Sequence, residues 1–139
     1  RKYIQMKFYN IYLSDTFGKG DSRKKILPTI KRKYKRNQVI KIVSKNLKLN
    51  FLNIEDLLNS INILIKKNKI KPGNYLMMNN KNFLIHKIFM QFNSINKKKI
   101  KFKYKSKESI NTKIPNIRLL PGLKLDNSKI SNIIEYIRR

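Results

Sequence analysis

The chain has no cysteine and no tryptophan, and it carries only 7 acidic residues and 1 histidine among 139 residues. Without cysteine there is no disulfide bond and no thiolate metal site. With few acids and a single histidine, general acid–base catalysis has few candidate groups. We therefore expect no catalytic residues, no metal, no cofactor and no enzyme activity.

Two further absences concern ligands and membranes. Residues 18–22 (GKGDS) contain two glycines, but the second is not followed directly by Lys and Ser or Thr, as in a phosphate-binding loop. This segment is expected to be a flexible loop. Apolar runs such as residues 63–65 (ILI) are far too short to cross a bilayer. The sequence thus predicts no small-molecule substrate and no membrane span.

Lysine and arginine number 34 against 7 acidic residues, which leaves a formal net charge of +27. Such an excess cannot be neutralised within the chain, so it favours a polyanionic partner, most naturally RNA or DNA. Binding to an anionic membrane would also call for a large apolar surface or an anchor. Because 40% of the residues are hydrophobic, the chain can still build one modest core.

The choice of residues within each class indicates an AT-rich genome. Lys, Ile and Asn dominate, Ala is absent, and valine occurs only at Val39 and Val43. We expect a mitochondrial protein, with a plastid or the cytoplasm of an AT-rich organism as alternatives. The first residue is Arg1 and not Met, so the N-terminus is native, processed or incomplete.

Apolar periodicity predicts the secondary structure. Alternation predicts strands at 3–13 and 99–105, and helical spacing predicts helices at 54–69, 81–92 and 128–139. Short extended pieces are expected at 39–43 and 47–51. The fold class expected is α+β, a small sheet with two or three helices on one face and a basic N-terminal extension. Residues 1–52 would form the extension with short strands, and residues 53–139 an α+β RNA-binding domain.

Polar residues at the predicted helix starts are interpreted as caps. Asn53 would cap the first helix, where Glu55 and Asp56 suit the positive end of the helix dipole better than a metal site. Asn80 would cap the second helix, and Asn127 or Ser128 the last one. His86 has no partner for a triad or a zinc site, so it is interpreted as packed or at the surface.

Two segments are candidates for a nucleic-acid interface. Residues 23–36 are the densest positive segment, an arm whose basic groups would meet phosphates while Tyr34 stacks on an unpaired base. The strand 99–105 places lysines on one face about 7 Å apart, a spacing that can follow a phosphate backbone. The predicted nucleic-acid-binding residues are Arg23, Lys24, Lys25, Lys31, Arg32, Lys33, Tyr34, Lys35, Arg36, Lys97, Lys98, Lys99, Lys101, Lys103 and Lys105.

From Glu55 onward, the order of features resembles the family of the eighth protein of the bacterial-type small ribosomal subunit. The residues before Asn53 have no counterpart in that family. The likeness covers at most residues 54–137 and rests on residues 56–62 (DLLNSIN) followed by lysines, on 102–104 (FKY) and on 117–123 (IRLLPGL). The resemblance implies a ribosomal protein that binds ribosomal RNA.

Charge, composition and resemblance together predict a structural constituent of a ribosome, most naturally mitochondrial. Its partners would be ribosomal RNA and neighbouring ribosomal proteins, bound through phosphate-neutralising lysines and arginines. The alternatives are a DNA-compacting nucleoid protein and a basic peripheral membrane or import-complex subunit.

Overall fold

The computed structural model describes residues 6–66, 70–106 and 116–139. These residues form an α+β fold, which confirms the predicted fold class. In chain order the elements are β1 (Tyr9–Leu13), β2 (Asp15–Phe17), α1 (Ile26–Lys35), β3 (Ile40–Ser44), β4 (Lys48–Leu49), β5 (Phe51–Asn53), α2 (Ile54–Lys66), β6 (Gly73–Met77), β7 (Phe83–Leu84), α3 (Ile85–Ile95), β8 (Phe102–Ser106) and α4 (Ile130–Arg138).

The described strands pair two by two, so the single small sheet expected from the sequence is divided. The pairs β1–β6, β2–β5 and β3–β8 are parallel, and β4–β7 is antiparallel. Each parallel pair joins distant parts of the sequence, with Tyr9 opposite Gly73 and Ile40 opposite Phe102. Parallel strands need a crossover connection. Helices α1, α2 and α3 therefore lie between paired strands in the sequence, whereas α4 follows the last strand.

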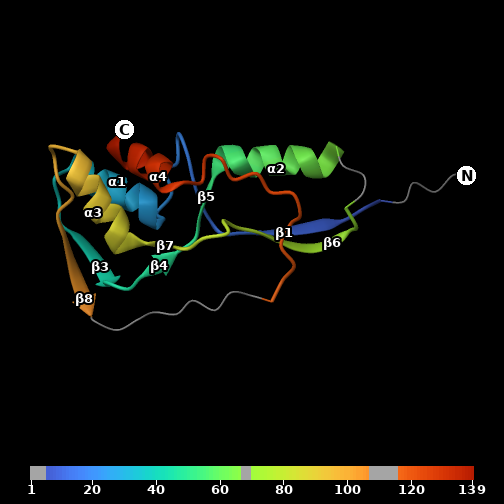
Figure 1. Cartoon of the computed structure of the whole chain (residues 1–139), viewed down its shortest axis with the longest axis horizontal. Coiled ribbons are helices and arrows are strands. Elements are labelled where there is room, and N and C mark those ends of the chain that lie inside the picture. The colour runs from blue at the N-terminus through green and yellow to red at the C-terminus, as the bar shows by residue number, and fades with distance from the viewer. Residues whose placement is uncertain (1–5, 67–69, 107–115) are drawn as a thin grey trace, which may run out of the picture.

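Figure 1 shows two groups of elements: α1, α3 and α4 gather near β3 and β8, whereas α2 lies along β1 and β6 at the other end. The first core consists of Phe17, Leu27, Ile30, Ile40, Ile42, Leu47, Phe51, Ile85, Ile88, Phe89, Phe92, Ile100, Ile133, Ile134, Tyr136 and Ile137. The second core consists of Leu52, Leu57, Leu64, Tyr75, Met77 and Leu120. The first core includes residues from both sides of the predicted boundary at 52–53, and the division into two domains stays a prediction.

The densest positive segment, residues 23–36, contains helix α1, which corrects its interpretation as an arm. Leu27, Pro28 and Ile30 are buried on one side of this helix. A proline is tolerated in a first turn, where its missing N–H would have no helical partner. The basic side chains of the last turn suit the negative end of the helix dipole. The few apolar positions decide where this segment lies, because only they can be buried without a charge.

The next two helices show where cap prediction succeeds and fails. α2 begins where expected, and the Oδ1 of Asn53 accepts a hydrogen bond from the N–H of Glu55 at 2.8 Å. α3 begins later than expected, after Leu84, and the predicted cap Asn80 is wrong. The reason is that residues 83–84 pair with β4 as strand β7 before the helix starts.

A buried polar network connects α2 with the segment before α4. The carboxylate of Asp56, which is 1% exposed, accepts hydrogen bonds from the N–H and Nδ2 of Asn127 and from the hydroxyl of Ser128. Asn127 and Ser128 therefore do not cap α4, whose N-cap is Lys129 without a side-chain bond. The Ser128 Oγ also accepts the N–H of Asn53 at 2.8 Å. This network joins the elements of the two cores.

Candidate functional site

A cleft of about 310 Å³ opens where the parallel strands β2 and β5 end. It is lined by Phe17, Ile54 and residues 18–23. In the register of this pair, the last residue of β2, Phe17, lies opposite the last residue of β5, Asn53. Ligands of open α/β sheets bind beyond the carboxyl ends of parallel strands. This cleft is the candidate site, and the loop of residues 18–25 forms its wall.

Gly18 brings the loop into close contact with the start of α2. It is buried, and a Cβ at this position would lie 2.3 Å from the Cγ2 of Ile54. Such a contact is far shorter than van der Waals distance, so only glycine fits without movement of Ile54. The glycine therefore fixes the distance between the loop and α2.

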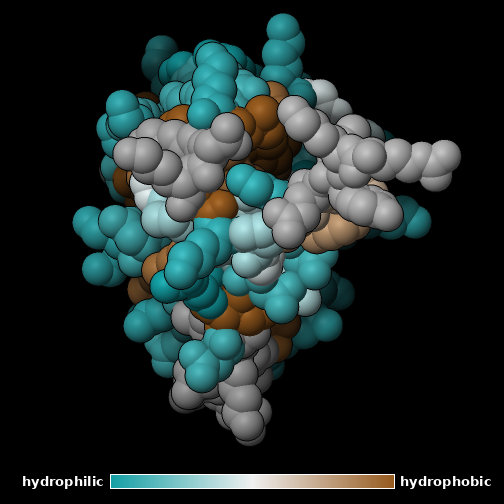
Figure 2. All heavy atoms as spheres, turned by 90° about the vertical axis from the view of Figure 1, so that its right-hand side faces the viewer, coloured by the Kyte–Doolittle hydropathy of each residue, from teal (hydrophilic) through white to brown (hydrophobic). Residues whose placement is uncertain are grey.

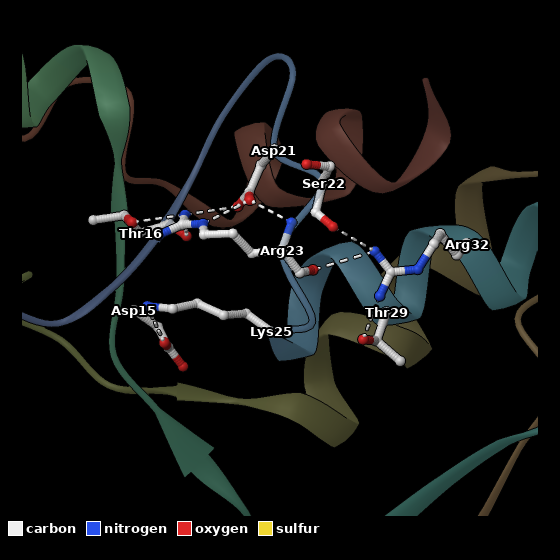
Figure 3. A network of polar contacts seen from close by, with 8 residues as sticks. All are labelled: Asp15, Thr16, Asp21, Ser22, Arg23, Lys25, Thr29 and Arg32. Carbon is white, nitrogen blue, oxygen red and sulfur yellow. Dashed lines mark hydrogen bonds and ion pairs between the residues drawn. The ribbon is translucent and has the colours of Figure 1, made fainter.

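Arg23 connects the loop to β2 by hydrogen bonds (Figure 3). The Nε and Nη2 of Arg23 donate to the two carboxylate oxygens of Asp21 at 2.7 and 2.8 Å, and Nη2 also donates to the O and Oγ1 of Thr16 at 3.0 and 2.9 Å. A bidentate arginine–carboxylate pair fixes orientation as well as distance. The segment predicted to be a flexible loop is therefore held by side-chain bonds at its base.

A second arginine and a lysine hold the start of α1 (Figure 3). The Nη1 of Arg32 donates to the backbone oxygens of residues 22 and 23 at 3.3 and 3.2 Å, and its Nη2 donates to the Oγ1 of Thr29 at 3.0 Å. These acceptors are neutral, so they leave the charge of Arg32 uncompensated. Lys25 instead pairs with Asp15, with 3.0 Å between Nζ and Oδ1. The loop thus carries positive charge on a fixed backbone.

Ionisation near the cleft follows from these contacts. Hydrogen bonds from Arg23 hold the pKa of the Asp21 carboxyl below its ordinary value. Because this pKa is lowered in the folded state, the carboxylate stabilises the fold above its unfolded pKa and loses that effect as the pH falls through the folded pKa. Burial raises the pKa of the Tyr136 phenol and lowers that of the Lys31 ammonium, whose Nζ lies 4.5 Å from the centre of the Tyr136 ring.

Tyr34, which was predicted to stack on an unpaired base, lies against the first core. Its ring packs edge-on against Phe92 with 4.9 Å between centroids, and the Nζ of Lys98 lies 4.8 Å from the ring centre. Lys98 also donates to the backbone oxygen of Lys35 at 3.1 Å. Tyr34 is half-buried against the first core, and its stacking on a base stays a prediction. The helical spacing of residues 26–35 accounts for this burial, because it turns Tyr34 inward.

The lysines of the predicted strand 99–105 lie as the alternation indicated. Lys101, Lys103 and Lys105 are exposed, while Phe102 and Tyr104 between them are half-buried against the first core. These lysines lie on the outer face of β3–β8 and are not part of the cleft. The predicted basic residues are thus divided among three places: the loop with α1, the outer face of β3–β8, and the segment between α3 and β8. In that segment Lys98 donates to the backbone of Lys35 and Lys99 to that of Asn93. Their contacts with RNA stay a prediction.

Sequence reasoning missed the polar residues that build the site. Asp21 stands two residues before Arg23, and this short spacing was the one local signal for their ion pair. The bonds from Asn127 and Ser128 to Asp56 join residues 71 and 72 positions apart, and no local pattern announces them. A second, apolar cleft of about 480 Å³ lies beyond the end of β6 and was not foreseen either. It is lined by Leu76, Met78, Asn79, Asn80, Ile117, Leu119, Leu120, Leu123 and Leu125.

The lone histidine lies away from the cleft, packed as predicted. Its Nδ1 lies 2.6 Å from the hydroxyl of Tyr104, and its ring is edge-on to Phe102. Within residues 6–66, 70–106 and 116–139, histidine and acidic side chains form no group of three that could hold a metal ion. In that same part of the chain, no helix is long and apolar enough to cross a membrane.

Known proteins share the fold but not the sequence. No protein family and no curated protein matches the sequence. UDP-N-acetylglucosamine 4-epimerase from Methanobrevibacter ruminantium superimposes with a TM-score of 0.66 at 12% identity, over 96% of this chain and 46% of that one. MoeE5 in complex with UDP-glucuronic acid and NAD gives 0.69 at 11% identity, over 94% and 47%. dTDP-glucose 4,6-dehydratase from Bacillus anthracis, in complex with NAD, gives 0.57 at 12% identity, over 94% and 44%.

The chain therefore has the fold of part of these sugar-nucleotide enzymes, and it spans less than half of their length. This overturns the prediction of a ribosomal, RNA-binding structural protein, together with its nucleoid and membrane alternatives. The prediction that the chain is not an enzyme is overturned as well. Net charge bears on solubility and non-specific binding and not on fold, so the charge of +27 does not determine the class of protein. Localisation in mitochondria stays a prediction.

Proposed function

We propose that this chain forms the sugar-nucleotide-binding part of an enzyme of the epimerase or dehydratase type. The observation that carries the proposal is the shared fold, which extends over 94–96% of the chain and includes proteins solved with UDP-N-acetylmuramic acid or UDP-glucuronic acid. The part that would bind the nicotinamide cofactor lies, in this proposal, in polypeptide outside residues 1–139. That is consistent with the share of the neighbours that the chain spans, 46–47%.

The chain's own residues do not fit a dinucleotide cofactor. A dinucleotide loop follows a strand, opens a helix and needs glycine at three positions, the third for close packing of the helix. Gly18 and Gly20 stand between β2 and α1, but the position of the third glycine is occupied by Arg23. The guanidinium of Arg23 is bound to Asp21 and Thr16 and fills the base of the loop. No step of the reaction is therefore assigned to a cofactor here.

The cleft beyond β2 and β5 suits a phosphorylated ligand. Its volume, about 310 Å³, is that of a small ligand site. The exposed side chain of Lys19 lines it, and the charge of Arg32, unpaired among the described residues, lies behind the loop, where it is bound to the backbone oxygens of residues 22 and 23. The charge of Arg23, which also lines the cleft, is compensated by Asp21. Charge-assisted bonds to phosphate oxygens are among the stronger hydrogen bonds. In this proposal the loop orients the diphosphate, and the sugar extends towards the missing cofactor-binding part.

The sequence predicted a sheet with helices on one face. We propose this arrangement only for the β1–β6 sheet. There α2 covers one face, and the second core lies between them.

Calorimetric titration of the intact native protein with UDP-glucose and dTDP-glucose tests this function. We expect saturable binding that UDP displaces and free glucose does not. Lys19→Glu is expected to weaken binding about tenfold, close to 1.4 kcal/mol. The matched control is Lys103→Glu, which makes the same change of charge on the outer face of β3–β8 and should leave binding unchanged. No binding at about 5 mM ligand, or equal weakening by both variants, would contradict the proposal.

A further inference from the structure

The edge of the β1–β6 sheet is closed on one side and open on the other. On the β6 side, the N–H of Leu76 donates to the oxygen of Arg118 at 2.7 Å, and the N–H of Leu120 donates to the oxygen of Leu76 at 2.9 Å. These two bonds form an isolated parallel bridge between Leu76 and Leu119, which covers this edge of β6. On the far side of β1, no strand is present among residues 6–66, 70–106 and 116–139. β1 is therefore an edge strand in the described structure.

The backbone groups that face this open edge can be assigned from the pairing. The oxygen of Phe8 accepts the N–H of Gly73, and the N–H of Ser14 donates to the oxygen of Met77, so the even-numbered residues of β1 face β6. Successive residues of a strand direct their N–H and C=O groups to opposite sides. The N–H and C=O groups of Tyr9, Ile11 and Leu13 consequently point to the open edge.

The two faces of the same sheet also differ. On one face, Tyr9 and Ile11 are half-buried against the second core beneath α2. On the other face Phe8 is 71% and Tyr12 48% exposed, and Met6 and Leu119 beside them are 74% and 55% exposed. This face also holds Asn10 and Asn74, which are hydrogen-bonded to each other at 2.9 Å, and the buried Leu76 opposite Tyr12. Figure 2 views this end of the molecule and shows hydrophobic surface among the hydrophilic side chains.

Charge is missing where an exposed edge would need it. Neither β1 (YNIYL) nor β6 (GNYLM) contains a charged side chain, in a chain of which 29% of the residues are charged. Natural proteins protect exposed edge strands with charges, proline or bulges. Parallel sheets, in addition, are normally covered on both faces. The β1–β6 sheet thus lacks the charged side chains that commonly protect an exposed edge.

We propose that an α/β segment outside residues 1–139 completes this sheet, with one strand paired in parallel to the open edge of β1 and a helix covering Phe8 and Tyr12. The inference rests on the proposed function, which places the cofactor-binding part outside this chain. The neighbours leave room for it, because this chain spans only 46–47% of their length. An apolar face of this kind suits a permanent contact and not a transient one.

Amide hydrogen exchange of the intact native protein tests the proposal. Within β1, the amides of Tyr9, Ile11 and Leu13 report on the open edge, and those of Asn10 and Tyr12 report on the pairing with β6. We expect the two sets to exchange within about tenfold of each other. If the outward set exchanges more than about 100-fold faster, no strand covers the edge and the proposal is overturned. Protection that disappears on dilution to a monomer would identify a second copy as the partner and would overturn it too.

Two pairs of variants test the face of β1 that exposes Phe8 and Tyr12, in the same protein. Phe8→Lys should expose the outward amides and raise their exchange about 100-fold. Its control Ile65→Lys changes a side chain of equal exposure, 71%, on α2 and should have no such effect. Tyr12→Thr and Val43→Thr, at 48% and 46% exposure, form a milder pair in case Phe8→Lys does not fold. Equal effects within each pair would contradict the proposal.

The outcome is separable from that of the proposed function. A protein whose outward amides are protected but which binds no sugar nucleotide would keep the completed sheet and lose the function. A protein that binds UDP-glucose with a freely exchanging β1 edge would keep the function and lose the completed sheet.

Discussion

The β3–β8 and β1–β6 sheets are both two-stranded and parallel, yet their outer faces differ completely. The β3–β8 sheet directs Lys41 and Lys103 outward, directly opposite each other, while its inner face packs on the first core. The β1–β6 sheet directs Phe8 and Tyr12 outward and has no charge. The lysines keep the first surface in contact with water. The second surface has no such charge, which teaches that the same local architecture can carry a charged outer face at one end and an uncharged one at the other.

The largest expected effect concerns the first core, on which the β3–β8 sheet packs. Phe89→Ala removes a side chain that is 0% exposed in the first core, and we expect a loss of about 3–5 kcal/mol in the free energy of unfolding, measured with urea. Leu64→Ala, near the end of α2 in the second core, should cost closer to 2 kcal/mol. Equal losses would mean that the two cores are equally well packed and would weaken the comparison.

The next largest effect concerns the buried network of Asp56, which joins the elements of the two cores. Asp56→Ala leaves the donors of Asn127 and Ser128 without their acceptor, and each unsatisfied buried group costs about 1–3 kcal/mol. We expect a total loss of about 3 kcal/mol by urea unfolding. Glu55→Ala is the control, because its exposed side chain stands at the next position. A loss for Asp56→Ala no larger than that of the control would show that the network does not hold the ends together.

A smaller effect concerns the loop between the two ends. Gly18→Ala would place a methyl group against the Cγ2 of Ile54, and overpacking of this kind costs about 1–3 kcal/mol. The double variant Gly18→Ala with Ile54→Ala removes the clashing atom and should lose less than the sum of the two single changes. Additive losses, measured by thermal unfolding, would rule out this contact as the cause.

The pH dependence of the first core is expected to lie on the alkaline side. The pKa of Tyr136 is raised by burial, so the folded state holds its proton more tightly than the unfolded state. Its stabilising effect is complete below the ordinary pKa of 10.0 and is lost as the pH rises through the folded value. We expect Tyr136→Phe to reduce the fall in the free energy of unfolding above pH 10.0. At pH 7 the free energy of unfolding should stay nearly unchanged, because the Tyr136 hydroxyl has no hydrogen-bond partner among the described residues. An unchanged fall in stability above pH 10.0 in Tyr136→Phe would contradict this assignment.

The smallest effect concerns the lysines of the β3–β8 sheet. Like charges directly opposite on a sheet are destabilising, so Lys103→Glu should raise the stability by about 0.2–1 kcal/mol through its contact with Lys41. The gain should shrink at 1 M salt, where surface charges are screened. A gain that is independent of salt would point to a cause other than the lysine pair.

Local sequence patterns predicted a helix or strand correctly wherever that element has a clear apolar face to bury. The alternation of residues 99–105 predicted the inward and outward sides of β8 correctly, and the spacing of residues 54–65 with Asn53 in front predicted α2 and its cap. In residues 23–36, by contrast, the charge concealed the few apolar positions that make α1. The helix there is stabilised by contact with α4, which no local pattern could reveal.

The sequence by itself determined the class of the fold, the amphipathic elements and the excess of positive charge. Only the tertiary structure decided which strands pair, that Asp56 binds Asn127 and Ser128, and that Arg23 closes the loop beside the cleft. The physical reason is the distance along the chain. Periodicity acts over a few residues. Parallel pairing joins residues as far apart as Asp15 and Phe51 or Ile40 and Phe102, and the buried bonds of Asp56 reach Asn127 and Ser128, so both depend on the packing of the whole fold.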